Sequence, residues 1–119
     1  MFSEFIRQER LDKDLSLRNF CKSINEDPSN WSKIERGLMI PPTDKKKLDL
    51  IANVLEIDLD SDKYKKMYDL AFIDVGKIPD YITDNKELLL QLPAFFRTIE
   101  NIKPTKEELL ELIENLRKN

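Results

Sequence analysis

The chain has 119 residues, of which 40% are hydrophobic, so it can build one compact domain or a small domain with an extension. Its 20 Lys and Arg against 23 Asp and Glu give a net charge of −3, so any nucleic-acid-binding surface has to come from the distribution of charge. No stretch approaches the roughly 20 apolar residues of a membrane span, and the first residues lack the pattern of a secretory signal. We therefore expect a cytoplasmic protein.

Residue usage argues against redox, metal and enzyme chemistry. The chain has one cysteine and no histidine, which leaves no intramolecular disulfide and no ligand set for zinc. Cys21 is either a small buried hydrophobe or a reactive thiol, and the lack of a nearby base favours the buried hydrophobe. There is also no glycine-rich phosphate loop and no convincing catalytic carboxylate pair. We expect no enzymatic activity and no cofactor.

Helical spacing of apolar residues predicts an all-α fold, since strand-like alternation is almost absent and only two residues are glycine. The first helix is expected from about Ser3 to Lys13. Ser16 can cap a second short helix, which Asn25 ends because Asn tolerates the left-handed conformation. The apolar residues of this second helix fall on one face: Leu17, Phe20, Cys21 and Ile24.

A third helix follows after only about three residues. Asp27 is its N-cap acceptor, Pro28 suits its first position, and Gly37 ends the segment. Trp31 and Ile34 are expected to point inward, with Trp31 in the core. Two helices with so short a connection cross steeply, as in a helix-turn-helix motif.

The run Trp31 to Gly37, WSKIERG, resembles the end of the recognition helix in lambda-repressor-like helix-turn-helix proteins, the Cro/repressor or XRE family. The resemblance extends back through Ile6 to Arg10 and forward through Pro41 and Pro42 to Leu55. It implies a lambda-repressor-like DNA-binding helical bundle in residues 1–58 and a transcriptional regulator, typically a dimeric repressor on a palindromic operator. It also implies a structural ion pair between Arg10 and Glu35.

Two residues depart from the family pattern. Leu17 stands where many members have a Gln that helps hold a phosphate, and Glu26 stands in the turn where a small apolar residue is usual. A carboxylate close to the DNA backbone is unfavourable, so these departures imply modest affinity or compensation by other residues.

The N-terminal residues of a recognition helix reach base edges in the major groove of double-stranded DNA. Asn30 could pair with adenine and Lys33 with guanine, whereas Pro28 offers only an apolar contact. The alternative is that short polar residues simply occupy an exposed helix face. The candidate base-contacting residues are Pro28, Ser29, Asn30, Ser32 and Lys33.

Basic residues near this helix are candidates for phosphate contacts. For Lys45 to Lys47 the alternative is a solvated start of the next helix. The expected phosphate set is Ser16, Arg18, Arg36, Lys45 and Lys46.

A fourth helix is expected from about Asp44 to Leu55, capped by Thr43 or Asp44. The apolar positions of the four helices then form one small core. The expected core residues are Phe2, Ile6, Leu15, Phe20, Ile24, Trp31, Ile34, Leu48, Ile51, Ala52 and Leu55.

An acidic linker, Asp58 to Asp62, separates this part from a second helical region, residues 59–119. A helix is expected over Lys63 to Asp74. Its apolar positions hold Tyr64, Met67, Tyr68, Ala71 and Phe72. Two more helices are expected over Lys86 to Leu92 and Ala94 to Asn101, with an interruption between them at Pro93. A capping box of Thr105 and Glu108 precedes a last helix, Lys106 to Lys118.

The apolar residues of this second region exceed one narrow stripe, which predicts a partner surface. The set comprises Leu88, Leu89, Leu92, Phe95, Phe96, Ile99, Leu109, Leu110, Leu112, Ile113 and Leu116. A homodimer would place two recognition helices on a palindromic site. The alternative is an antitoxin or adaptor that binds a toxin or other protein through these helices, with autoregulatory DNA binding.

Overall fold

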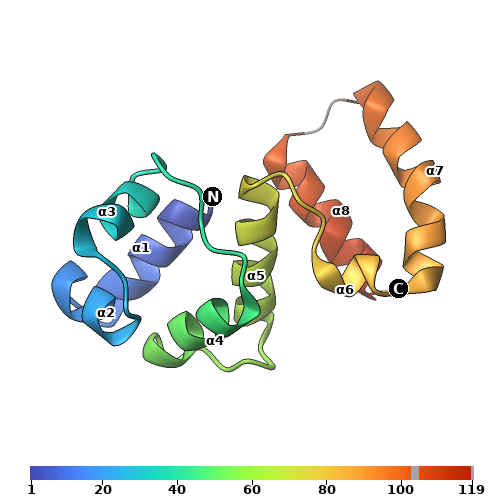
Figure 1. Ribbon diagram of the computed structural model, residues 1–119. Coiled ribbons are helices and arrows are strands. Elements are labelled where there is room, and N and C mark those ends of the chain that lie inside the picture. Colours follow the sequence, from blue (N-terminus) through green and yellow to red (C-terminus); the bar gives the residue numbers. More distant parts are fainter. Residues whose placement is uncertain (103–104, 119) are drawn as a thin grey trace.

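The computed structural model describes residues 1–102 and 105–118, without the side chains of residues 98–102, 112, 116 and 118. All regular structure in these ranges is helical, which confirms the all-α prediction (Figure 1). The molecule is elongated, with extents of 45 × 27 × 20 Å. Its helices are α1 (Phe2–Asp12), α2 (Leu17–Ser23), α3 (Pro28–Glu35), α4 (Lys45–Val54), α5 (Asp62–Asp74), α6 (Asp80–Thr83), α7 (Lys86–Ile102) and α8 (Lys106–Lys118).

Side-chain caps begin α2, α3 and α4 where the sequence places them. The side chains of Ser16, Asp27 and Asp44 each accept an amide proton three residues on, at 3.1 Å in every case. Each cap satisfies one of the amides that the first turn of a helix leaves without a partner. These local bonds fix where the short helices start.

Left-handed residues end the first five helices. Asp14, Asn25, Gly37, Glu56 and Gly76 have φ between 55° and 74°. In each case the following residue donates its amide to the carbonyl five residues earlier, at 2.8–3.2 Å. This is the Schellman arrangement, which closes the last carbonyls of a helix and turns the chain sharply.

The core predicted for the first four helices is present. Ten of its eleven residues are buried, and Leu15 is partly buried against them. Trp31 is fully buried, and its ring lies 5.6 Å from that of Phe20, so it is a core residue.

Helix α5 lies between the two ends of the molecule (Figure 1). It packs against α1 on one side and α8 on the other. Its apolar residues, Tyr64, Met67, Tyr68, Ala71 and Phe72, are all buried in the same continuous core. The helix after the acidic linker therefore supports the first four helices, and the domain boundary after Asp58 remains a prediction.

The interruption expected at Pro93 is wrong, because α7 runs continuously from Lys86 to Ile102. Pro93 removes one helical hydrogen bond, but it is exposed, so water can satisfy the carbonyl that loses its partner. Leu92 beside it is buried and holds the helix against its neighbours. The short helix α6 was not predicted. The side chains of Ile99, Leu112 and Leu116, which the sequence assigns to the apolar set, lie outside the described residues.

Helix α8 begins at the expected capping box, where the Glu108 amide donates to the Thr105 hydroxyl at 3.2 Å. Near its end, Arg117 forms an ion pair with the fully buried Asp69 of α5, at 2.6 Å. The Tyr81 hydroxyl donates to the same carboxylate at 2.8 Å. Burial raises the Asp69 pKa, and the bonds from Tyr81 and Arg117 oppose that rise. This network joins α5, α6 and α8.

Candidate nucleic-acid interface

The inner face of α3 is fixed by a buried polar cluster. Arg10 donates from Nε and Nη2 to the two carboxylate oxygens of Glu35, at 2.9 and 2.8 Å. Its Nη1 donates to the Leu15 carbonyl at 2.8 Å, and the Trp31 indole donates to Glu35 at 3.0 Å. The bond to Glu35 is the main reason that the Arg10 pKa is raised. Because both partners are buried and joined by a two-point bond, the pair fixes which face of α3 packs against α1.

The opposite face of α3 is exposed and polar. Pro28, Ser29, Asn30 and Lys33 are exposed, and Ser32 is partly buried. The Ser29 hydroxyl donates to Asp27 at 3.1 Å. Within the described residues, the side chains of Asn30 and Lys33 make no hydrogen bond or ion pair. They stand one helical turn apart, so they share a face of α3.

Some residues of the expected phosphate set already bond within the protein, and others form no bond among the described residues. The Ser16 hydroxyl caps α2, and Arg36 Nε donates to the Ser32 carbonyl at 3.2 Å. Lys45 pairs with Asp49 at 2.8 Å, although the Lys45 side chain is 68% exposed. Arg18 and Lys46 are exposed and, in the described part of the chain, have no partner. Arg18 and Lys46 are thus the free cations of this set.

Lys47 has a structural contact that the sequence did not indicate. Its ammonium donates to the Ile24 carbonyl at 2.6 Å and pairs with Glu26 at 2.9 Å. The Glu26 carboxylate in the α2–α3 turn is therefore neutralised from the first turn of α4. The sequence shows Glu26 in the turn and a run of three lysines at the start of the helix after next, but nothing in it pairs Glu26 with Lys47.

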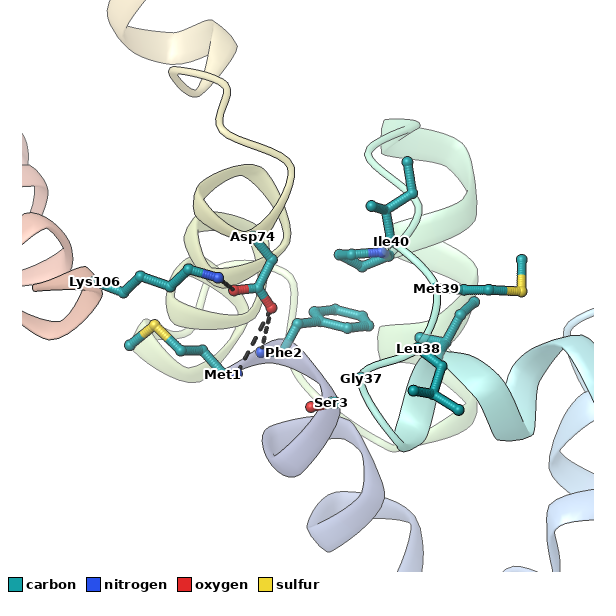
Figure 2. A pocket seen from close by; sticks show the side chains of 11 residues that line it. Met1, Phe2, Ser3, Gly37, Leu38, Met39, Ile40, Asp74 and Lys106 are labelled. Carbon is teal, nitrogen blue, oxygen red and sulfur yellow. Dashed lines mark hydrogen bonds and ion pairs between the residues drawn. The ribbon is translucent and has the colours of Figure 1, made fainter.

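The loop after α3 presents apolar side chains. Leu38, Met39 and Ile40 are 67%, 40% and 70% exposed. They border a cavity of about 270 Å³ that the start of α1 and Asp74 also line (Figure 2). Figure 2 shows Asp74 between the first residues of α1 and Lys106, and Leu38 and Met39 pointing away from that contact. Polar groups therefore mark the beginning of α3 and apolar groups mark its end.

The thiol and the acidic groups are the remaining candidates for chemistry. Cys21 is fully buried, and its pKa is raised to about 11, mainly by burial. Among the residues that the structure describes, no three potential metal ligands come together. No helix in the same ranges has the length and apolarity needed to cross a membrane.

Comparisons with protein families, with curated proteins and with solved structures find no match for this chain.

Proposed function

We propose that the chain is a sequence-specific DNA-binding transcriptional regulator that inserts α3 into the major groove. The observation that carries the proposal is the two-sided construction of α3. One face is fixed by the buried Arg10 and Glu35 pair, and the other exposes the side chains of Asn30 and Lys33, which have no partner in the described part of the chain. A lambda-repressor-like arrangement of α1 to α5 is part of this proposal.

The proposed contacts follow from the chemistry of these side chains. An Asn amide can both donate to and accept from the adenine edge, and a lysine ammonium can donate to the guanine acceptors. Arg18 at the start of α2 and Lys46 at the start of α4 are the cations proposed to hold phosphates. Because Lys47 neutralises Glu26, the turn carries less repulsion toward phosphates than the sequence implies.

DNA binding by a homodimer is part of the same proposal, since a second recognition helix about 34 Å away matches a palindromic site. Its support is the α7 face, defined by Leu89, Leu90 and Phe96, which are 44%, 82% and 43% exposed. Figure 1 shows α7 at the outer edge of the molecule, away from α1 to α3. A contact between two α7 faces would leave both α3 helices accessible.

The test is fluorescence anisotropy of the full chain with duplex DNA from upstream of its own gene, at several salt concentrations. Replacing Asn30 or Lys33 by Ala should weaken specific binding about fivefold to a hundredfold, as expected for loss of a base contact worth about 1–3 kcal/mol. Lys66→Ala removes an exposed lysine of α5 that has no partner within the described ranges, and it should change the affinity less than twofold. Equal binding of upstream and scrambled duplexes would contradict the proposal.

A second candidate function is that of an antitoxin or adaptor whose α7 face binds another protein. Leu90 favours it, because a leucine that is 82% exposed beside Leu89 and Phe96 is poorly placed in a lone chain. Co-expression with the product of the neighbouring gene, followed by light scattering, separates the two uses of α7. A heteromeric complex that Leu90→Lys abolishes supports the adaptor, and a dimer of the chain alone that the same change abolishes supports the homodimer.

A further inference from the structure

A second cavity, of about 540 Å³, lies where the two ends of the molecule meet around α5. Tyr64 and Tyr68 of α5 and Tyr81 of α6 form its aromatic wall. The Tyr68 ring lies 6.2 Å from that of Tyr64 and 6.4 Å from that of Tyr81. The volume falls in the range of small-molecule sites, about 300–1,000 Å³.

One hydroxyl of this wall has no hydrogen-bond partner among the described residues. The Tyr64 hydroxyl bonds to Asp49, and the Tyr81 hydroxyl bonds to Asp69 at 2.8 Å. Tyr68 is only 9% exposed, and its hydroxyl has no hydrogen bond within the described residues. Since this residue lines the cavity, its hydroxyl is available to a molecule that enters.

Three cations and two carboxylates line the cavity, and two further carboxylates lie directly behind two of the cations. Two of its lining cations are neutralised by carboxylates behind them, Lys45 by Asp49 at 2.8 Å and Arg117 by Asp69 at 2.6 Å. The other charged lining residues are Lys65, Asp80 and Asp84, which leave one net negative charge.

The titration of Tyr68 agrees with this sum. Its pKa is raised, first by burial and then by four surrounding carboxylates, those of Asp80, Asp49, Asp69 and Asp84. The same carboxylates would attract a positive charge placed at this hydroxyl and repel an anion.

We propose that this cavity binds a singly charged organic ammonium ion, with its cationic head beside the Tyr68 hydroxyl and the carboxylates of Asp80 and Asp84. One ring of this wall already holds a cation, since the Arg117 guanidinium lies over the Tyr81 ring at 4.7 Å from its centroid, as the ring quadrupole favours. A ligand with several positive charges is disfavoured because Lys65 also lines the space and only one negative charge is left in excess. The walls come from α4, α5, α6 and α8, so the ligand would contact both ends of the molecule. The inference does not depend on DNA binding, and its test contains no DNA.

The experiment is a titration of the full ¹⁵N-labelled chain with benzyltrimethylammonium, followed by amide chemical shifts. We expect saturable shifts for the amides of Tyr64, Tyr68 and Tyr81, and none of that kind with benzoate at the same ionic strength. Replacing Asp80 and Asp84 by Asn should raise the dissociation constant at least fivefold. The matched control, Asp60→Asn with Glu111→Gln, removes the same charge from exposed positions outside the cavity. In this control the dissociation constant should change by less than twofold.

Asp80 begins the short helix α6, so the double variant could disturb that helix. Asp84→Asn alone, at the end of α6, keeps the test decisive, with an expected weakening of about twofold to threefold. Absence of saturable shifts at the three tyrosines in the unmodified chain would overturn the proposal. So would binding of benzoate at the same amides, or an unchanged dissociation constant in both variants.

Discussion

The buried pair of Arg10 and Glu35 gives the sharpest prediction for stability. Arg10→Met keeps most of the side-chain volume but removes all three hydrogen bonds of the guanidinium. The Glu35 carboxylate would remain buried with only the Trp31 indole as donor, and the Leu15 carbonyl would lose its side-chain donor. Breaking one partner of a buried pair costs about 3–5 kcal/mol, a large part of the roughly 5–15 kcal/mol that stabilises a typical domain.

Urea unfolding followed by tryptophan fluorescence measures this cost directly. Trp31 is the only tryptophan of the chain, and its indole bonds to Glu35, so the signal comes from the cluster itself. We expect Arg10→Met to lower the free energy of unfolding by about 3–5 kcal/mol. Arg7→Met removes an exposed arginine one turn earlier that has no partner among the residues described, and it should change the free energy of unfolding by less than about 0.5 kcal/mol.

Two further variants test whether the cost comes from the bond between Arg10 and Glu35. If Arg10→Met does not fold, Arg10→Lys retains the charge but loses the two-point bond, and it should still cost about 1–3 kcal/mol. The double variant Arg10→Met with Glu35→Leu should lose less than the sum of its single variants, by at least about 1 kcal/mol. A cost for Arg10→Met no larger than that for Arg7→Met, or strict additivity in the double variant, would refute the reasoning.

Three other changes have defined outcomes. Glu56 has a φ of 59°, which strains a residue that carries a side chain, and its ion pair with Lys13 is exposed. Glu56→Gly should therefore raise the free energy of unfolding by about 0.5–1 kcal/mol in the same urea assay. A lower free energy of unfolding would show that the left-handed conformation is not strained. The Cys21 pKa rises from 9.0 to about 11 in the folded chain, so a smaller fraction of the thiol is ionised at pH 8. Cys21 should therefore react with a disulfide reagent at pH 8 at least about a hundredfold more slowly in the folded chain than in guanidinium. Equal rates in the two states would show that the thiol is accessible in the folded chain. Lys47→Met removes the donor to the α2–α3 turn and leaves the Glu26 carboxylate without its partner. It should lower the free energy of unfolding in urea by about 1–2 kcal/mol and also weaken DNA binding measured by anisotropy. Lys46→Met should weaken DNA binding without changing the free energy of unfolding.

The sequence predicted the helices well where short-range interactions decide them. Ser16, Asp27 and Asp44 act on amides three residues away, and Asn25 and Gly37 close helices through bonds that span five residues. Apolar spacing located the core for the same reason, since the faces of a helix follow from its own period. Pro93 was misjudged because the cost of a proline in a helix depends on whether water reaches the carbonyl that it leaves free.

Only the tertiary structure decided how the charged groups are used, because their partners lie far away in the chain. Lys47 belongs to a lysine run that looks like a phosphate-binding cluster, yet it reaches back to Glu26 and closes the turn. Asp69 appears as a polar residue in an apolar helix, and its buried carboxylate is stabilised by Tyr81, 12 residues later, and by Arg117, 48 residues later. The sequence by itself determined an all-α chain with two short helices and an exposed first turn at Asn30. The packing of distant helices determined which charges remain free on that surface, since a charge is neutralised by whatever group the fold brings within bonding distance.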